Sequence, residues 1–387
     1  MEIIAIITLA MALAFSLILT PLVRSLAIRI GFVDKPGERK IHSREIAYGG
    51  GIAVALAVLA ALTIIYLQTI SPIEKDPDDP PPITLAAIAT GAAGALLIGL
   101  VDDRYKLSPL TKLIGQIGLA IIAVVGGVRI TAFIGDNWFM KCVTTLWIVL
   151  ITNSFNLLDN MDGLCAGTVA IASGMLAIVS LDSGQTALVL ALASICGASL
   201  GFLRYNRAPA SIFLGDTGSL FVGYSMATLT AVVTYYRHNK PSHLAIGIPV
   251  LILAIPLYDT FSVILIRLKE KRPIMRGDNS HFSHRLVDLG MNRRQAVTTI
   301  HLACLAIGIP ATILGQLSER SGLLIIGQAF MVITLVALLE RAGRYRAMHS
   351  ENSPWMNKSE SGRLDSRPTR SGPELEPKID MQQAEKH

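Results

Sequence analysis

The sequence predicts an all-α, polytopic integral membrane protein. Of its 387 residues 52% are hydrophobic and only 16% are charged, and the mean hydropathy is +0.53. This balance is too apolar for a water-soluble chain of such length. Apolar runs of about 17 to 25 residues, the length with which a helix crosses a bilayer, recur between short polar loops. Eleven such runs are predicted to span the membrane.

The first run, Ile3 to Val23, is expected to be an uncleaved first span, because it is long enough to cross and no basic residue precedes it. The four cysteines lie in or beside apolar runs without a Cys-x-x-Cys spacing, which argues against a disulfide framework or a zinc site. The net charge of +6 gives no reason to expect nucleic acid as a partner. The distribution of Lys and Arg between the loops explains it better.

That distribution also predicts the orientation in the membrane. The loops on one side hold 19 Lys and Arg, and these loops are 24–48, 102–112, 204–217 and 267–295. The loops on the opposite side hold only 5, and they lie near 71–82, 135–141, 182–185, 236–243 and 317–321. Because cytoplasmic loops are enriched in positive charge, we expect the N-terminus outside and, after eleven spans, the C-terminus in the cytoplasm.

Residues 150–164 are the most informative stretch, because they end an apolar run yet carry several Asn and Asp side chains. Such groups are costly in hydrocarbon unless they face water, a partner or an ion. Asn156, Asp159 and Asp162 are spaced by three residues and share one broad helix face, and Gly163 offers a place for the helix to break. A helix-capping cluster is the alternative. We favour a site for a cation and a phosphate.

The apolar run before residue 102 ends in the adjacent carboxylates Asp102 and Asp103. Neighbouring carboxylates repel each other, so one is suited to bind a cation while the other, with a raised pKa, accepts a proton. The alternative is a solvated helix end.

Asp216 lies between Gly215 and the small residues Thr217 and Gly218, which leaves room for a phosphate and its Mg²⁺ to approach the backbone. The chain has neither a P-loop pattern nor a Gly-x-Gly-x-x-Gly pattern. A metal site at the membrane is therefore the expected way to hold a diphosphate.

The loop 267–295 is dense in Arg, Lys and His. One interpretation is an anchor on anionic lipid, and the other is a lid whose basic side chains bind phosphoryl oxygens. The residues assigned to such a lid are Arg276, His281, His284 and Arg285. A transition-metal site at the two histidines is a further alternative, disfavoured because no cysteine is near.

Residues 1–342 are expected to form the membrane domain. The tail 343–387 is rich in Ser, Pro, Glu, Arg and Lys, and this composition predicts a disordered cytoplasmic segment.

As a set, five motifs resemble those of the polyprenyl-phosphate N-acetylhexosamine-1-phosphate transferases, membrane enzymes that begin bacterial cell-envelope glycan synthesis. The resemblance runs from about Asp34 to Arg294 and is strongest to the branch that uses UDP-N-acetylglucosamine. The motifs are Asp34-x-Pro-x-x-Arg-Lys-x-His42, Gly99-Leu-Val-Asp-Asp103, Asn153-x-x-Asn-x-x-Asp-x-x-Asp-Gly-Leu164, Phe213-Leu-Gly-Asp-x-Gly-Ser219 and Asp278-x-x-His-x-x-His-Arg285.

The resemblance implies transfer of N-acetylglucosamine 1-phosphate, or a related N-acetylhexosamine 1-phosphate, from the UDP-sugar to undecaprenyl phosphate, with release of UMP. It implies an enzyme of the bacterial inner membrane that depends on Mg²⁺, with Mn²⁺ as the alternative ion. The bilayer is a further partner, and a homodimer is the candidate assembly.

The resemblance also assigns roles to residues. It implies Mg²⁺ bound by Asp216 with Asn156, and a uridine pocket formed by Asp162, Asn206 and Phe213. Asp102 or Asp103 would assist the lipid phosphate, and Asp159 would belong to the inner part of the site. The sugar-side diphosphate would be held by His281, His284 and Arg285.

The chain departs from the family pattern in two places. Glu45 and Ala47 replace two prolines of the first loop, and Ser283 stands where a third histidine is frequent. We expect Ser283→His to be tolerated. The rival functions are a phospho-N-acetylmuramoyl-pentapeptide transferase, a secondary transporter for an anionic solute, and an inactive scaffold. A transporter predicts carboxylates near the middle of its spans, whereas here they gather at one membrane face.

Overall fold

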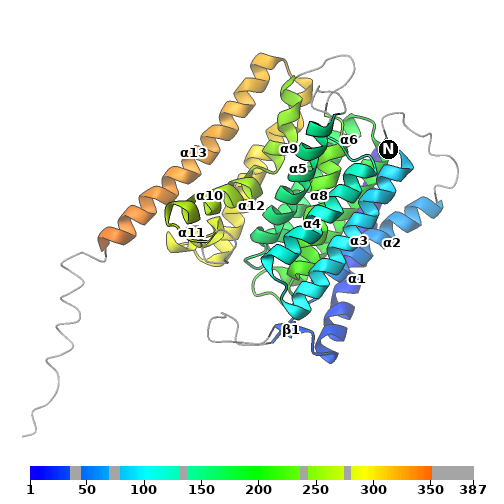
Figure 1. Cartoon of the computed structure of the whole chain (residues 1–387), viewed down its shortest axis with the longest axis horizontal. Helices are drawn as coiled ribbons and strands as arrows, with labels where there is room; N and C mark the ends of the chain where they lie inside the picture. The colour runs from blue at the N-terminus through cyan, green and yellow to red at the C-terminus, as the bar shows by residue number, and fades with distance from the viewer. Residues whose placement is uncertain (35–44, 69–78, 131–136, 236–242, 274–279, 351–387) are drawn as a thin grey trace, which may run out of the picture. The chain divides into compact units, whose positions relative to one another are not determined.

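The computed structural model describes residues 1–34, 45–68, 79–130, 137–235, 243–273 and 280–350, with side chains through 341. In the described part, helices dominate and the two strands are very short (Figure 1). The helices of the first part are α1 (Glu2–Arg29), α2 (Gly50–Gln68), α3 (Pro82–Tyr105), α4 (Pro109–Val125), α5 (Trp138–Leu158), α6 (Leu164–Asp182), α7 (Thr186–Asn206) and α8 (Gly215–Val232). Those of the second part are η1 (His243–Ile246), α9 (Gly247–Ile252), α10 (Ala254–Lys269), α11 (Phe282–Asp288), α12 (Arg293–Thr312), η2 (Leu314–Gln316) and α13 (Glu319–Ser350).

The predicted class, an all-α polytopic membrane protein, is confirmed. Eight helices of the described residues are long and apolar enough to cross a membrane, and the pair formed by η1–α9 and α10, bent by 71°, brings the number to nine. The other two of the eleven expected spans correspond to α4, which is shorter at 17 residues, and α8. The number eleven stays a prediction.

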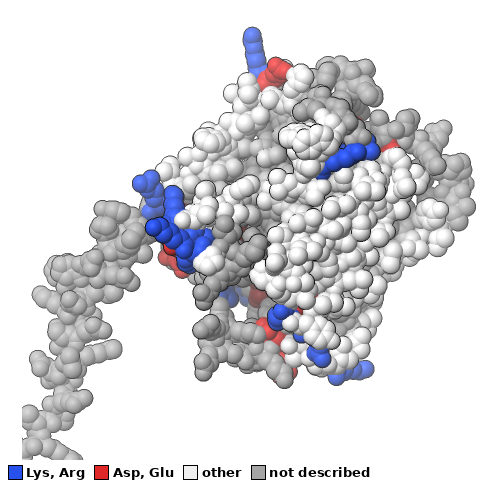
Figure 2. All heavy atoms as spheres, viewed as in Figure 1, with Lys and Arg blue, Asp and Glu red and all other residues white. Residues whose placement is uncertain are grey.

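The exposed surface of the helix bundle is apolar, as a lipid-facing surface must be. Large aliphatic side chains point outward from α1 and α13, such as Ile3, which is 73% exposed, and Leu324, which is 76% exposed. Figure 2 shows uncharged side chains over the middle of the helices and Lys and Arg near their ends.

Helix α8 lies in the centre, because α2, α3 and α5 all pack against it and every residue from Thr217 to Ala231 is buried. Glycines allow this close packing. A Cβ at Gly51 of α2 would lie 2.2 Å from the backbone nitrogen of Gly218, and one at Gly99 of α3 would lie 2.2 Å from the carbonyl oxygen of Asp216. Small residues at helix contacts let backbones approach in this way. The first turn of α8 is thereby fixed beside the end of α3.

The strands β1 (Val33–Asp34) and β2 (Ile46–Ala47) pair antiparallel and flank the first loop. The chain after β2 then pairs with the segment before α8, since Phe213 donates to the Ala47 carbonyl at 2.9 Å and Gly50 donates to the Phe213 carbonyl at 3.0 Å. These contacts bring two segments of the predicted site together.

The end of the chain differs from expectation. Residues 343–350, expected to be disordered, form the last part of α13. The rest of the predicted tail, 351–387, lies outside the described residues, as do Arg39, Lys40 and His42 of the first motif.

Candidate active site

Asp103 binds the N-terminus of α8, the helix that carries Asp216. Its Oδ1 accepts the backbone N–H of Asp216 at 2.9 Å, and its Oδ2 accepts the N–H and the hydroxyl of Thr217 at 3.0 and 2.6 Å. The first N–H groups of a helix have no partner within the helix, and the helix dipole attracts negative charge there. Asp103, which was predicted to be catalytic, thus binds the first turn of α8 and holds Asp216 in position.

Gly215 adopts φ +71°, and a Cβ at this position would lie 2.6 Å from the Asp103 carboxylate. This explains the glycine that precedes Asp216, because the left-handed backbone and the close carboxylate both favour a residue without a side chain.

Asp102 and Asp216 share a lysine. Asp102 is 2% exposed, and its carboxylate accepts the Leu107 N–H at 2.7 Å and the Lys112 Nζ–H at 2.9 Å. The same Nζ lies 3.7 Å from Oδ2 of Asp216. Lys112 therefore offsets the repulsion between two carboxylates. Sequence reasoning missed this residue, and the signal for it is a single Lys near the start of a helix that carries no other charge, four residues after the N-cap Ser108.

Asn156 completes the contacts of Asp216. Its amide donates to Oδ1 of Asp216 and, at 2.9 Å, to the hydroxyl of Ser219. Asn153, one turn earlier on α5, instead donates to Gln116 of α4 at 2.5 Å and fixes the neighbouring helix. The structure thus brings together Asp102, Asp103, Asn156 and Asp216, as the sequence predicted, from three different helices.

The loop after α5 carries Asp159 and Asp162. Burial raises the pKa of Asp159 well above its ordinary value, and the neighbouring carboxylates of Asp216, Asp103 and Asp162 raise it further. Repulsion of this kind requires that Asp159 lie near the Asp216 cluster, which agrees with the inner position expected for it.

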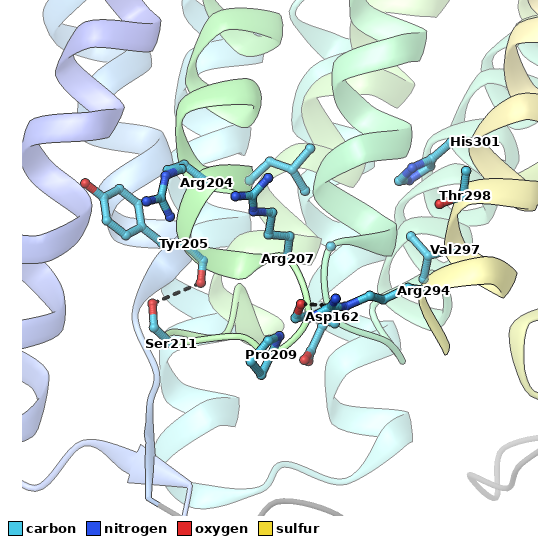
Figure 3. A pocket seen from close by; sticks show the side chains of 13 residues that line it. Asp162, Arg204, Tyr205, Arg207, Pro209, Ser211, Arg294, Val297, Thr298 and His301 are labelled. Carbon is cyan, nitrogen blue, oxygen red and sulfur yellow. Dashed lines mark hydrogen bonds between the residues drawn. The ribbon is translucent and has the colours of Figure 1, made fainter. Parts of the chain in front are cut away.

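Asn206 is buried and connects two segments. Its Oδ1 accepts the Gly163 N–H at 3.0 Å, and its amide donates to the Ile212 carbonyl at 3.0 Å. Asp162 accepts the Ala210 N–H at 2.9 Å and lines a cleft of about 700 Å³ (Figure 3). Phe213 instead lies 6.2 Å from the ring of Tyr48, centroid to centroid. Of the three residues assigned to a uridine pocket, only Asp162 lines that cleft, and the pocket stays a prediction.

The histidine segment forms α11 and is fixed by α10. His281 Nδ1 lies 3.0 Å from Oδ2 of Asp259, and the Phe282 N–H donates to the other oxygen of Asp259 at 2.6 Å. Asp259 is 1% exposed. It orients the imidazole and the start of α11 together. Its signal in the sequence is a single carboxylate within the apolar run of α10, to which we gave no role.

Arg285 is buried in an ion pair with Glu340 of α13, with Nε–Oε2 at 3.0 Å. It also donates to the hydroxyl of Ser262 at 2.7 Å. These contacts connect α11 with α10 and α13, and they occupy the guanidinium that we expected at the diphosphate. Arg276, the other predicted arginine, lies outside the described residues.

His284 is half-buried, and its pKa is lowered by burial and then by the nearby His281 and Arg293. The lowered pKa disfavours the cationic form that the lid interpretation needs, and the role of His284 at the diphosphate stays a prediction. Ser283 is buried and its hydroxyl donates to Oδ1 of Asn160. A histidine at this buried position would displace the contact with Asn160. We therefore now expect Ser283→His to be unfavourable, in contrast to the expectation from the sequence.

Among the described residues, no three His, Cys, Asp or Glu side chains are placed to hold a metal ion. The Asp216 region instead offers oxygen atoms from one carboxylate and one amide, a donor type that fits hard cations such as Mg²⁺.

Fold and site together define a multi-pass membrane protein with a buried carboxylate cluster at one end of its helices. A family model described as glycosyl transferase family 4 matches residues 85–234. The probable undecaprenyl-phosphate N-acetylglucosaminyl 1-phosphate transferase of Bacillus subtilis (strain 168) is 36% identical over 332 residues, 83% of this chain and 88% of that protein.

Two further relatives are more distant. The decaprenyl-phosphate N-acetylglucosaminephosphotransferase of Mycolicibacterium smegmatis is 31% identical, covering 82% of this chain and 85% of the relative. The undecaprenyl-phosphate alpha-N-acetylglucosaminyl 1-phosphate transferase of Escherichia coli (strain K12) is 26% identical, covering 77% and 79%. The chain belongs to glycosyl transferase family 4, as its motifs predicted, and it is a glycosyl-1-phosphate transferase.

Proposed function

We propose that this enzyme transfers N-acetylglucosamine 1-phosphate from UDP-N-acetylglucosamine to a polyprenyl phosphate, undecaprenyl phosphate being the expected acceptor. The relatives carry this donor sugar and such acceptors in their names. The observation in the structure that supports the proposal is the Asp102–Lys112–Asp216 cluster, a buried polar site at the end of membrane-spanning helices. A lipid phosphate and a water-soluble nucleotide meet at such a place.

In this reaction an oxygen of the lipid phosphate attacks the phosphorus that bears the sugar. A new phosphorus–oxygen bond forms, the bond to UMP breaks, and the electron pair leaves with the UMP oxygen. Such transfers depend mainly on positioning and on cations that offset the spread negative charge. Lys112 supplies one such charge beside Asp216. Asp159, in the loop directly after α5 and near the Asp216 carboxylate, is a candidate to exchange a proton with the lipid phosphate.

The proposal includes Mg²⁺, with Mn²⁺ as the alternative. Asp216 and the carbonyl oxygen of Asn156 would hold it, since the amide nitrogen of Asn156 already donates to Asp216 and Ser219. Mg²⁺ is commonly bound by one or two carboxylates with substrate phosphates as the other ligands, so two protein ligands suffice. When bound, the ion neutralises charge on the diphosphate.

The proposed location is the bacterial inner membrane, with the carboxylate cluster in the cytoplasm and the N-terminus outside. The bias of 19 against 5 Lys and Arg between the two sets of loops supports it. A transporter is disfavoured, because the charged residues of the site lie at the ends of α3 and α8 rather than at mid-span.

The test is release of UMP by purified protein with undecaprenyl phosphate, Mg²⁺ and a panel of UDP-sugars. We expect UDP-N-acetylglucosamine to be the best donor. A preference for UDP-N-acetylmuramoyl-pentapeptide would favour the rival transferase, and no release with any donor would refute the enzyme proposal.

Asp216→Asn tests the assigned metal ligand within that assay. We expect it to insert and fold normally but to lose turnover by on the order of 100-fold or more, because an amide is a weaker ligand for a hard cation. Glu270→Gln, an exposed carboxylate paired with Arg272 after α10, is the matched control and should keep its activity.

A further inference from the structure

A basic cleft lies beside the predicted site, between the end of α7 and the start of α12. Figure 3 shows Arg204 and Arg207 on one wall and Arg294 and His301 on the other. Its volume is about 700 Å³, far more than a single ion needs. Nothing in the proposed reaction uses these arginines.

The cleft is positively charged, and its arginine side chains are accessible to a ligand. Arg294 donates to the Ala208 carbonyl at 3.1 Å, and Arg204 lies over the Tyr205 ring at 5.9 Å, so neither is neutralised by these contacts. Within the described residues none of the three arginines forms an ion pair, and all three are exposed. The carboxylate in the cleft, Asp162, accepts the Ala210 N–H. Three guanidiniums against one carboxylate attract a phosphate group.

The surroundings of the cleft indicate where that phosphate comes from. Both walls continue into helices that are long and apolar enough to cross the membrane. Beyond the arginines the walls become apolar at Leu203 and Val297. Further along the same helices, Leu200 is 41% exposed and Leu302 is 59% exposed. A molecule with a charged head and aliphatic chains fits this sequence of surfaces, with its head among the arginines and its chains along α7 and α12.

We propose that this cleft binds the phosphodiester headgroup of an anionic phospholipid. Arg207 and Arg294 hold the phosphate from opposite sides, and Thr298 with its hydroxyl lies in the same cleft. The bound lipid would connect α7 with α12 next to the loop that carries Asp162. The site is separate from the Asp102–Lys112–Asp216 cluster and does not depend on the proposed reaction.

The experiment measures binding of phosphatidylglycerol to the purified full-length protein in neutral detergent, by native mass spectrometry, with phosphatidylcholine as the zwitterionic comparison. We expect phosphatidylglycerol to bind preferentially, and the double variant Arg207→Gln, Arg294→Gln to bind it more weakly by on the order of tenfold or more. The double variant Lys269→Gln, Lys271→Gln removes two exposed charges at the end of α10 and just after it, and should bind as the wild type does.

Four results would overturn the proposal. Equal binding by the arginine variant would exclude these side chains, and an equal loss in the lysine variant would show attraction to overall charge only. Competition by UDP or inorganic phosphate distinguishes the sources of the phosphate. Displacement of the lipid by millimolar UDP would assign the cleft to the nucleotide donor, and displacement by inorganic phosphate alone would show a general anion site.

Discussion

At the scale of single residues, the site depends on how one lysine is shared. Lys112 contacts the carboxylates of Asp102 and Asp216, while Asp103 is used by the backbone of α8. Two adjacent aspartates of one motif therefore have different tasks. The first takes part in the charge balance of the site, and the second holds in place the helix that carries Asp216.

Lys112→Gln separates the role of the lysine from that of the metal. We expect kcat to fall roughly 100-fold, because a cation at the developing charge is lost. The Mg²⁺ concentration for half-maximal activity should fall or stay constant, because the carboxylates that attract Mg²⁺ are then less neutralised. Asp216→Asn should instead raise that concentration. The measurement is UMP release across a Mg²⁺ titration, and a higher Mg²⁺ requirement in Lys112→Gln would contradict the assignment.

The lowered pKa of His284 predicts a pH effect on stability. Because the folded protein binds this proton more weakly than the unfolded chain does, stability is lost as the pH falls through the unfolded value of about 6.5. Lowering the pH from 7.5 to 5.5 should therefore reduce the Tm of the wild type more than that of His284→Gln. Thermal unfolding in detergent measures both, and equal reductions would show that the lowered pKa makes no contribution.

At the scale of helices, glycine contacts set the position of the site. The backbones of α2 and α3 approach the first turn of α8 at Gly51 and Gly99, where a Cβ would meet main-chain atoms. Main-chain atoms cannot rotate away as a side-chain end can. The distance between the ends of α3 and α8, and with it the sharing of Lys112, depends on these small residues.

Gly51→Ala tests this contact. We expect a loss of about 1 to 3 kcal/mol in the free energy of unfolding, because α2 and α8 must separate to admit the methyl group, together with reduced activity. Gly118→Ala in α4, where nothing lies within 4 Å of the added Cβ, is the matched control. It should be neutral or stabilising, since alanine favours a helix over glycine. If the two variants had the same Tm, the close packing would not limit stability.

At the scale of the whole molecule, orientation in the membrane decides which substrates reach the site. In the proposed topology, which follows the positive-inside rule, the ends of α3 and α7 and the start of α8 face the cytoplasm, the compartment that supplies nucleotide sugars in the proposed reaction. The basic cleft lies at the same ends of the helices.

Single cysteines test the orientation in intact cells. With the four native cysteines replaced, Arg320→Cys at the start of α13 should react with an impermeant thiol reagent, and Lys271→Cys after α10 should not. Both positions are exposed on the protein, so a difference in labelling between them reports the side of the membrane and not burial within the fold. Labelling of position 271 in cells that have not been permeabilised would show that the orientation is the reverse of the proposed one.

The sequence by itself determined the class of fold and the family, and it indicated Asp102, Asp103, Asn156 and Asp216, which the structure brings together. Length and apolarity of helical spans are local properties, and motifs such as residues 153–164 are continuous in the chain, so both can be recognised without coordinates. Only the tertiary structure decided how these residues divide their tasks. Lys112 and Asp259 acquire their roles from partners on other helices. Arg285 forms an ion pair with Glu340, 55 positions further along the chain. Such pairings depend on which helix faces pack together, and this is a property of the whole bundle that no local pattern of residues encodes.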